Sequence, residues 1–516
     1  MNNRWLKFFR KWHRWPGVIM GFFFILWAIS GIVMNHRQLF SGLDIDRKYL
    51  PKEHRYINWN NAAVKSGIKI GHDSLLIYGN IGIWLTDSTM SSFSDFNAGF
   101  PDGIDNRKIS SMLVTARGNI YAGTLFGLQY YNPLRGKWTK LSLPVEDERI
   151  QCLTEKGSEV IILTRSEMLV AKDDPGNFRT VRLNLPPPEG YDNKAGLFRT
   201  IWVIHSGEIY GMAGRLIVDL LGLTVILLTI TGALHFAMPY ALRRQKRLKK
   251  SVLLASSTKR TSASWHKKAG IWIFLFILIN TVTGMFLRPP LLITIASARV
   301  GKIPMSLLDT PNPWEDKLRA IIYDDEAGGY IIGTSEGLFF TDLRPAGKMV
   351  PLPGQPPQSV MGINVFEKTG PGSYLVGSFN GLYDWHFGDG VPAGVCTNHM
   401  TGQPPGQMNT GSKPFGDEMV SGYLKLEIGK EVYFDYNRGA VVLNSNEDLP
   451  GMPGEIIEKS PVSWWNFALE VHTGRIFKPL MGDFYVLLVP LMGIFGTILV
   501  ISGLIVWIKL YARKNR

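Results

Sequence analysis

Four long apolar stretches constrain the fold of this 516-residue chain more than any other feature. Each holds about 18 or more mostly apolar residues, enough to cross a hydrocarbon layer of about 30 Å as a helix rising about 1.5 Å per residue. The stretches cover residues 16–34, 214–238, 269–287 and 484–508. The first lacks a small-residue cleavage site, so we interpret it as an anchor rather than a signal peptide. The sequence therefore predicts a membrane protein with four spans.

The net charge of +14 is concentrated in three short stretches. Residues 1–15 contain five Lys or Arg, residues 241–268 contain ten and residues 509–516 contain four, and none of these stretches contains Asp or Glu. In a four-span topology all three lie on the same side, which the positive-inside rule assigns to the cytoplasm. We therefore expect a multi-pass membrane protein with both termini cytoplasmic. The same location of charge argues against a nucleic-acid partner.

The membrane part is an internal repeat. Residues Trp12–Gly31 align without gaps on Trp265–Gly284, and Ile204–Gly214 parallel Val471–Gly482 with one extra residue. Both halves have the same topology, which predicts a pseudo-twofold axis along the membrane normal. The expected parts are a cytoplasmic N-terminus with the first helix (1–36), an outer segment (37–204), a second helix (205–240), a basic loop (241–266), a third helix (267–288), a second outer segment (289–470) and a fourth helix with a tail (471–516).

The predicted axis relates two pairs of histidines. His13 and His266 become mates at the cytoplasmic end, and His205 and His472 become mates at the outer end. A b-type haem with two histidine ligands needs imidazoles from different helices on opposite faces of its iron. The pattern predicts about two non-covalently bound b haems, because the chain has no CxxCH motif.

Two further histidines lack symmetry mates. His36 is either an interfacial residue or a further cofactor contact. His235 lies at the level of the cytoplasmic pair, so whether it or His13 faces His266 stays open. Asp219 follows Arg215 by one helical turn, and we expect these two side chains to form an ion pair.

Three arginines near the histidines are candidates to bind haem propionates through charge-assisted hydrogen bonds. They are Arg14, Arg215 and Arg475.

The motifs "HRWPGVIMG", "HSGEIYGMAG", "WHKKAG" and "VHTG" are each followed, later in the adjoining apolar stretch, by Ser/Thr-Gly. Together they resemble the PepSY-associated transmembrane proteins. That family includes dihaem ferric-siderophore reductases of the bacterial inner membrane, and the resemblance implies the same membrane for this chain. The resemblance covers the helices and their flanks, and it implies family histidines at His13, His205, His235, His266 and His472. The outer segments depart from the family because they contain no convincing PepSY-type module, so the substrate does not carry over.

The outer segments have their own repeat of about 40–45 residues, in which two β-rich strands flank a turn containing Gly. Three copies occur in each segment, beginning near Leu75, Ile120 and Val160 and near Tyr330, Tyr374 and Val432. This period is typical of propeller blades, and the copies resemble those of two-component-regulator propellers. We expect one periplasmic six-bladed propeller built from both segments, or else two separate β domains. Cys152 and Cys396 could pair across the segments or stay free.

The predicted fold class is a four-helix membrane bundle with an internal parallel repeat plus an all-β outer domain. The predicted function is a membrane oxidoreductase that carries electrons across the bilayer to a periplasmic acceptor, such as a ferric siderophore, another metal chelate or a redox protein. No cytoplasmic stretch could hold a nicotinamide or flavin domain, so the donor is membrane quinol or a soluble reductant. The alternative is a sensor, transporter or assembly scaffold with a ligand-binding propeller and no redox activity.

Overall fold

The computed structural model describes residues 3–344, 347–359, 361–386, 393–395, 416–426, 429–445 and 447–510. The chain divides into two compact units. The helical unit comprises Met1–Phe40, Asn193–Thr310 and Trp464–Arg516, and the sheet unit comprises Ser41–Asp192 and Pro311–Ser463. Cys396, and with it any pairing to Cys152, lies outside the described residues.

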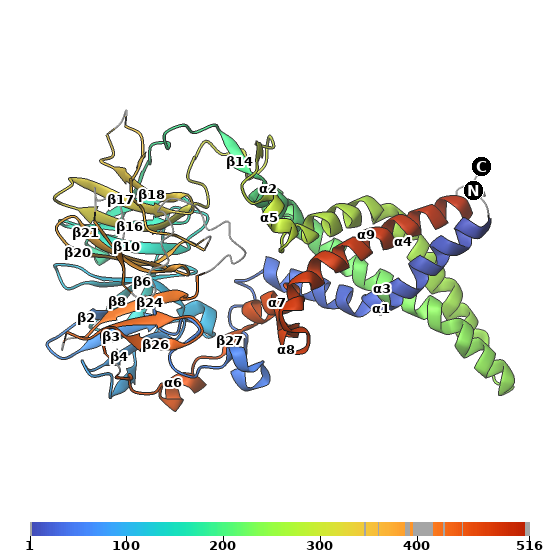
Figure 1. Ribbon diagram of the computed structural model, residues 1–516. Helices are drawn as coiled ribbons and strands as arrows, with labels where there is room; N and C mark the ends of the chain where they lie inside the picture. The colour runs from blue at the N-terminus through green and yellow to red at the C-terminus, as the bar shows by residue number, and fades with distance from the viewer. Residues whose placement is uncertain are drawn as a thin grey trace. The chain divides into compact units, whose positions relative to one another are not determined.

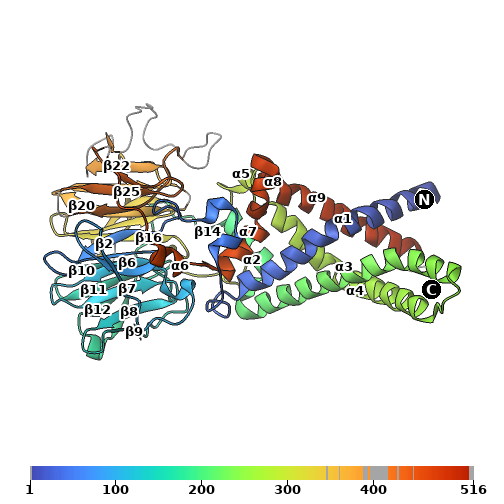
Figure 2. The ribbon, with the colours of Figure 1, turned by 90° about the horizontal axis from the view of Figure 1, so that it is seen from below.

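Four long helices form the body of the helical unit (Figure 1). They are α1 (Asn3–Asn35), α3 (Gly211–Arg247), α4 (Leu253–Met285) and α9 (Tyr485–Leu510). Each of them contacts two others, in the order α1, α3, α4, α9 and back to α1 (Figure 2). Within the described residues, these helices provide four candidate membrane spans by length and composition. The prediction of apolar membrane helices is confirmed.

Short helices precede two of the long ones. The main ones are α2 (Leu197–Ser206) before α3 and α7 (Trp464–His472) before α9, while α5 (Leu291–Ile295) follows α4 and α8 (Lys478–Met481) follows α7. Helices α2 and α7 are both followed by a glycine in the left-handed region, Gly207 at φ 79° and Gly474 at φ 75°. A residue with a Cβ is strained there, so the "HSG" and "HTG" motifs end each helix at its histidine or one residue later.

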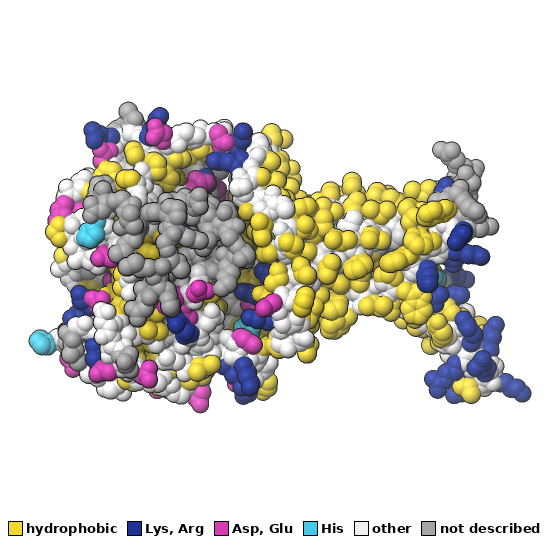
Figure 3. Space-filling view, viewed as in Figure 1, with side chains coloured by type: hydrophobic (Ala, Val, Ile, Leu, Met, Phe, Trp, Pro, Cys, Tyr) yellow, Lys and Arg dark blue, Asp and Glu magenta, His cyan; other side chains and the backbone are white. Residues whose placement is uncertain are grey.

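The segment that we expected to be a basic loop, residues 241–266, is largely helical. Helix α3 continues to Arg247, and α4 already begins at Leu253. The segment contains neither Gly nor Pro and is rich in Lys, Arg, Leu and Ala, all of which favour helix. Lys and Arg side chains gather at this end of the helices, near the two chain termini, while hydrophobic side chains cover the length of the bundle (Figure 3).

The sheet unit is built from small antiparallel sheets. Its first segment forms three sheets of four strands. The first sheet consists of β2 (Ser66–Lys69), β3 (Leu75–Gly79), β4 (Gly82–Thr86) and β5 (Phe93–Asp95), and the second of β6 (Ile109–Val114), β7 (Ile120–Thr124), β8 (Gly127–Asn132) and β9 (Lys137–Leu141). The third consists of β10 (Ile150–Lys156), β11 (Glu159–Thr164), β12 (Met168–Lys172) and β13 (Thr180–Leu183). Its second segment forms three more sheets within the described residues. The first consists of β16 (Leu318–Asp324), β17 (Gly329–Thr334), β18 (Gly337–Thr341) and β19 (Val350–Pro351), and the second of β20 (Ile363–Gly370), β21 (Ser373–Ser378), β22 (Gly381–His386) and β23 (Ala393–Gly394). The third consists of β24 (Val420–Lys425), β25 (Glu431–Asp435) and β26 (Gly439–Val442). The expected β strands are confirmed, and they pair in antiparallel sheets.

Two smaller strand pairs and a short helix complete the description. Strands β1 (Asp44–Ile45) and β27 (Val462–Ser463) pair within the sheet unit, and α6 (Gly454–Glu458) precedes β27. Strands β14 (Lys194–Gly196) and β15 (Arg299–Gly301) pair within the helical unit.

The core of the sheet unit consists of apolar clusters, each packed between two sheets that follow one another along the chain. A further cluster joins the last sheet to the first, because Phe434 of β25 and Leu424 of β24 pack with Ile77 of β3. Beside this cluster, the Tyr423 N–H donates to the Lys65 carbonyl at 2.9 Å. Each of the six sheets therefore packs against two others.

Candidate functional site

The helical unit brings four histidines together in two pairs. His13 on α1 faces His266 on α4, with ring centres 6.0 Å apart and ring planes inclined by 75°. His205 at the end of α2 faces His472 at the end of α7, with ring centres also 6.0 Å apart and planes inclined by 60°. We refer to them as the 13/266 pair and the 205/472 pair.

Each of these histidines hydrogen-bonds through Nδ1 to a backbone carbonyl of a neighbouring long helix. The contacts are His13 to Leu499 at 3.0 Å, His266 to Leu228 at 3.0 Å, His205 to Asn280 at 3.0 Å and His472 to Trp27 at 3.2 Å. A carbonyl only accepts, so Nδ1 must carry the proton. The other nitrogen, Nε2, makes no hydrogen bond to any residue that the structure describes. Neutral imidazole in this tautomer is a metal ligand oriented by its own carbonyl partner.

The four carbonyls belong to one recurring motif, which we call the docking motif. Three residues after the carbonyl comes Ser or Thr, and one residue later comes Gly, so all three positions share a helix face. The four motifs comprise Trp27, Ser30 and Gly31 on α1; Leu228, Thr231 and Gly232 on α3; Asn280, Thr283 and Gly284 on α4; and Leu499, Ser502 and Gly503 on α9. The hydroxyl oxygens lie 3.0–3.4 Å from the same Nδ1 atoms.

The glycine of each docking motif makes room for the imidazole. A Cβ built on Gly284 would lie 2.7 Å from His205 Cε1, and one on Gly503 would lie 2.8 Å from His13 Cε1. The corresponding distances are 3.2 Å at Gly232 and 3.4 Å at Gly31. The Ser/Thr-Gly dipeptides that end each repeat are therefore parts of the histidine sites, because a side chain there would push the ring away from its carbonyl.

The docking contacts cross between the two sequence halves. His13 and His205 from the first half dock on α9 and α4 of the second half, whereas His266 and His472 dock on α3 and α1 of the first half. Exchanging the halves exchanges these contacts one for one. The helical unit thus has the pairwise symmetry that the sequence repeat indicates.

The geometry of the pairs fits a metal with two axial imidazoles. A metal about 2 Å from each Nε2, with each ring centre about 1 Å beyond its nitrogen, would separate the ring centres by about 6 Å. Within the described residues, no cluster of three or more His, Cys, Asp or Glu could hold a metal ion.

Two arginines with unsatisfied buried atoms lie near the 205/472 pair: Arg475 follows His472 by three residues, and Arg288 follows Gly284, the docking glycine of His205, by four. The Nε atoms of Arg475 and Arg288 are buried and have no hydrogen-bond partner within the described residues. Arg475 forms an ion pair with Glu470 through its Nη2. Burial raises the pKa of Glu470, and burial together with the charge of Arg475 lowers the pKa of Arg288. A guanidinium with an unpaired Nε could donate a further hydrogen bond to a carboxylate, such as that of a haem propionate. Arg288 was not among the predicted residues, because its symmetry mate is the uncharged Asn35.

The other predicted arginines have different surroundings. Arg14 is exposed, and its guanidinium lies 4.6 Å from the ring centre of Phe236. Arg215 pairs with Glu208 at 3.5 Å. The exposed side chain of His235 lies on α3 and faces no other histidine at ring-contact distance in the described chain. Its role as a ligand stays a prediction.

The expected ion pair between Asp219 and Arg215 is wrong. Asp219 instead contacts the first helix and the residue after it: His36 Nε2 lies 2.5 Å from Oδ2, and Asn35 donates to Oδ1 at 2.9 Å. Arg215 lies one turn closer to the start of α3, where Glu208 offers a carboxylate. His36 is thus held by a carboxylate rather than paired with another histidine.

Comparison with known protein families finds a match over the first part of the chain. Residues 2–238 match the family described as the PepSY-associated TM region, which confirms the resemblance noted in the sequence. No curated protein matches the chain.

Several solved structures are similar to this chain. One is an extracellular domain from B. thetaiotaomicron whose description assigns it to a hybrid two component system, with 11% identity over 74% of this chain and 33% of that one and a TM-score of 0.36. Another such domain from the same organism has 13% identity over 75% and 39%, with a TM-score of 0.31. PorZ, a surface component of the type-IX secretion system of Porphyromonas gingivalis, has 10% identity over 74% and 44%, with a TM-score of 0.21. The chain spans about a third of the length of the first of these structures.

Proposed function

Because the chain carries a PepSY-associated transmembrane region, we propose that this membrane protein is a b-type cytochrome that moves electrons across a bacterial inner membrane to an acceptor outside. One observation carries the proposal. Four histidines form two pairs, and each imidazole is fixed through Nδ1 to a carbonyl, which presents Nε2 as a ligand. A single imidazole at a helix end could be an interfacial residue. Four imidazoles that each hydrogen-bond a backbone carbonyl through Nδ1, and that form two symmetric pairs, support two cofactor sites.

The 13/266 pair would hold one haem and the 205/472 pair a second, and haem iron bound by two histidines supplies one-electron transfer. Arg475 and Arg288 would bind propionates of the haem at the 205/472 pair. Along α1, His13 lies 14 residues before Trp27, the residue that fixes His472. At 1.5 Å per residue the two sites are therefore about 20 Å apart along the helix. Two sites in series suit transfer across a bilayer.

The direction of transfer follows from the charges. His13 and His266 belong to the basic stretches 1–15 and 241–268, which the positive-inside rule assigns to the cytoplasm. The segments of the sheet unit leave the helical unit after α1 and after α4, at the opposite ends of these helices, so they belong to the periplasm. Electrons would enter at the 13/266 pair from membrane quinol or a soluble reductant. They would leave at the 205/472 pair to a ferric chelate, a ferric siderophore or a redox protein.

We also propose that the six sheets form one six-bladed propeller. The support is the cluster that joins β24 and β25 to β3, since it links the last sheet of one segment to the first sheet of the other. A fragment of residues 37–204 alone would expose the apolar faces of its terminal sheets and should be unstable. Coexpression with residues 289–470 should restore a folded complex. A stable, monomeric first fragment would instead indicate two independent domains.

Transfer across a membrane tests the proposed function. The full chain is reconstituted in vesicles that contain ferric citrate and a ferrous-specific dye, and dithionite is added outside. We expect reduced-minus-oxidised spectra of a b-type cytochrome and dye absorbance inside the vesicles. His205→Ala should abolish the internal signal, and His72→Ala, which removes an exposed histidine of the sheet unit, should not. Folded protein without haem absorbance would refute the redox function and leave a sensor or scaffold.

A further inference from the structure

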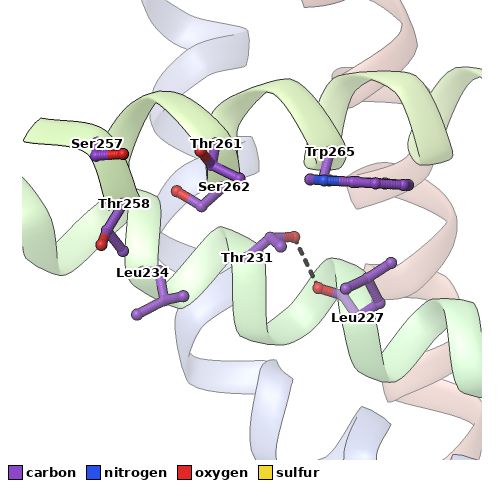
Figure 4. A pocket seen from close by; sticks show the side chains of 8 residues that line it. All are labelled: Leu227, Thr231, Leu234, Ser257, Thr258, Thr261, Ser262 and Trp265. Atoms are coloured by element: carbon purple, nitrogen blue, oxygen red, sulfur yellow. Dashed lines mark hydrogen bonds between the residues drawn. The ribbon is translucent and has the colours of Figure 1, made fainter. Parts of the chain in front are cut away.

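A pocket of about 470 Å³ lies between α3 and α4, beside the 13/266 pair. Five of its lining residues carry hydroxyl groups: Thr231, Ser257, Thr258, Thr261 and Ser262. Figure 4 shows the residues of α4 along one wall, with Leu227, Thr231 and Leu234 of α3 along the other and the flat ring of Trp265 at one end. The pocket therefore combines hydrogen-bonding groups with an apolar wall and an aromatic face.

Three of these hydroxyls are available to a ligand. Ser257, Thr258 and Thr261 make no side-chain hydrogen bond within the described part of the chain, whereas Thr231 donates to the Leu227 carbonyl at 2.7 Å. None of the lining residues is charged. An anionic head group would find no counter-charge among them, so the pocket favours a neutral ligand with polar atoms on an apolar ring.

The pocket is directly connected to the histidine pair. The Thr231 oxygen lies 3.2 Å from His266 Nδ1, and Trp265 is the residue before His266. A ring bound against Thr231 and Trp265 would therefore lie beside a ligand of the proposed first haem.

The symmetry-related groove in the other half is different. Extending the register of the gapless repeat toward the N-terminus places Trp5, Phe8 and Phe9, besides Trp12, where α4 has Thr258, Thr261, Ser262 and Trp265. These aromatic rings pack on one another, with centres 6.0 Å apart for Trp5 and Phe8 and 5.9 Å apart for Phe8 and Trp12. Only the α3–α4 side thus exchanges a row of aromatic rings for hydroxyls. His13 and His266 each hydrogen-bond a backbone carbonyl in the same way with either set of residues beside them, so the hydroxyls of α4 are not needed to position the histidines. This points to a separate role for the hydroxyls.

We propose that this pocket binds the ring of a membrane quinol and is the electron-donor site of the proposed redox function, on which this inference rests. Hydroxyls of α4 hydrogen-bond the quinol oxygens, Trp265 stacks on the ring, and the isoprenoid tail extends into lipid between α3 and α4. On oxidation the two O–H bonds break and the quinol becomes a quinone. Two electrons pass to two equivalents of ferric haem iron, and two protons pass to water at the basic ends of the helices.

Binding of a defined quinone to the full chain tests the proposal. Decylubiquinone is titrated into protein in nanodiscs and followed by calorimetry, and haem is measured in the same sample. Removing two hydroxyls in Thr258→Val/Thr261→Val should weaken binding about tenfold, because each lost hydrogen bond contributes part of the affinity. Ser257→Ala, at an exposed position, tests a third hydroxyl with little risk to folding and should weaken binding several-fold. The matched control is Thr224→Val on α3, whose hydroxyl bonds its own helix at Leu220, and it should bind as the unaltered protein does.

Three outcomes decide the matter. Tenfold weaker binding in the double variant, with Thr224→Val unchanged, supports the quinol site. Binding that is absent or equal in all variants of a haem-containing protein overturns the site and leaves the proposed function in place. Displacement of the quinone by phosphatidylglycerol in the nanodisc would identify a lipid site and also overturn the proposal. Absence of haem would refute the proposed function itself, whatever the quinone binding.

Discussion

The two halves of the helical unit are alike at the four paired histidines and their docking motifs, and they differ at other positions around these sites. The pair α1 and α3 and the pair α4 and α9 both provide a docking motif on each long helix. Helices α2 and α7 both carry a histidine in their last turn, followed two residues later by a left-handed glycine. These repeated features all act on the imidazoles. The comparison teaches that the position of four rings is the property that both halves preserve.

The differences lie around the sites. In the first half Asn35 and His36 bind Asp219, whereas the symmetry-related positions of the second half hold Arg288, Pro289 and Pro490. Similarly, the row of aromatic rings on α1 is replaced by hydroxyls on α4. The halves have therefore diverged at positions that would contact partners, bind propionates or transfer protons. They have not diverged at the positions that fix the four paired imidazole rings.

The largest expected effect is the loss of one haem when any one of the paired histidines is replaced. His205→Ala and His472→Ala should each reduce the haem content from about two to about one per chain, because both halves contribute one ligand to that site. The pyridine haemochrome assay gives the ratio, and His72→Ala is the control. Unequal losses of haem in His205→Ala and His472→Ala would contradict the equivalence of the two halves. Loss of the haem at the 13/266 pair in His235→Ala, but not in His13→Ala, would show that α3 supplies the ligand opposite His266.

Next come the docking glycines, for which the structure predicts an order. Gly284→Ala and Gly503→Ala place a Cβ under 3.0 Å from a histidine ring and should destabilise the protein by about 1–3 kcal/mol and lower haem occupancy. Gly232→Ala should have a smaller effect and Gly31→Ala the smallest. Gly270→Ala is the control, since its Cβ would be 3.8 Å from Leu228 Cδ2. Thermal unfolding and haem content measure the series, and an order unrelated to these distances would argue against ring displacement.

The contact of Asp219 with Asn35 and His36, which is found only in the first half, is expected to have a moderate effect on stability. Asp219→Leu leaves His36 and Asn35 without their shared carboxylate and should cost about 2 kcal/mol of stability. The double variant His36→Leu/Asp219→Leu removes both members of the contact and should recover part of that loss, as in other buried pairs. Thermal unfolding in detergent compares the two. A double variant less stable than the single one would show that Asp219 does not stabilise the protein through its contact with His36.

The smallest effects are expected at the docking hydroxyls, and here the two histidine pairs should differ. Ser30 Oγ lies 3.0 Å from His472 Nδ1, closer than the Trp27 carbonyl at 3.2 Å, whereas Ser502 Oγ lies 3.4 Å from His13 Nδ1, farther than the Leu499 carbonyl at 3.0 Å. Ser30→Ala should therefore cost about 1 kcal/mol and Ser502→Ala less. Haem retention on heating measures both, and equal losses would contradict the assignment of the main hydrogen bond.

The sequence predicts the parts of the fold that are local or repeated. Apolar length gives the membrane helices, and the gapless repeat relates His13 to His266 and His205 to His472. It does not predict where each ring docks, because the His13 partner, Leu499, is 486 residues away and is chosen by helix packing. Asp219 shows the same limit, since its sequence neighbour Arg215 suggested a partner and its spatial neighbour His36 provides one. The Ser/Thr-Gly endings were visible as a repeat, but their contact with histidine depends on tertiary structure.

The number of haems in the purified full-length protein tests the central claim most directly. The pyridine haemochrome assay on protein of known concentration should give about two b haems per chain, with low-spin ferric signals from two sites that each have two histidine ligands. One haem would contradict the equivalence of the two halves, and a folded protein without haem would contradict the assignment of the histidine pairs altogether.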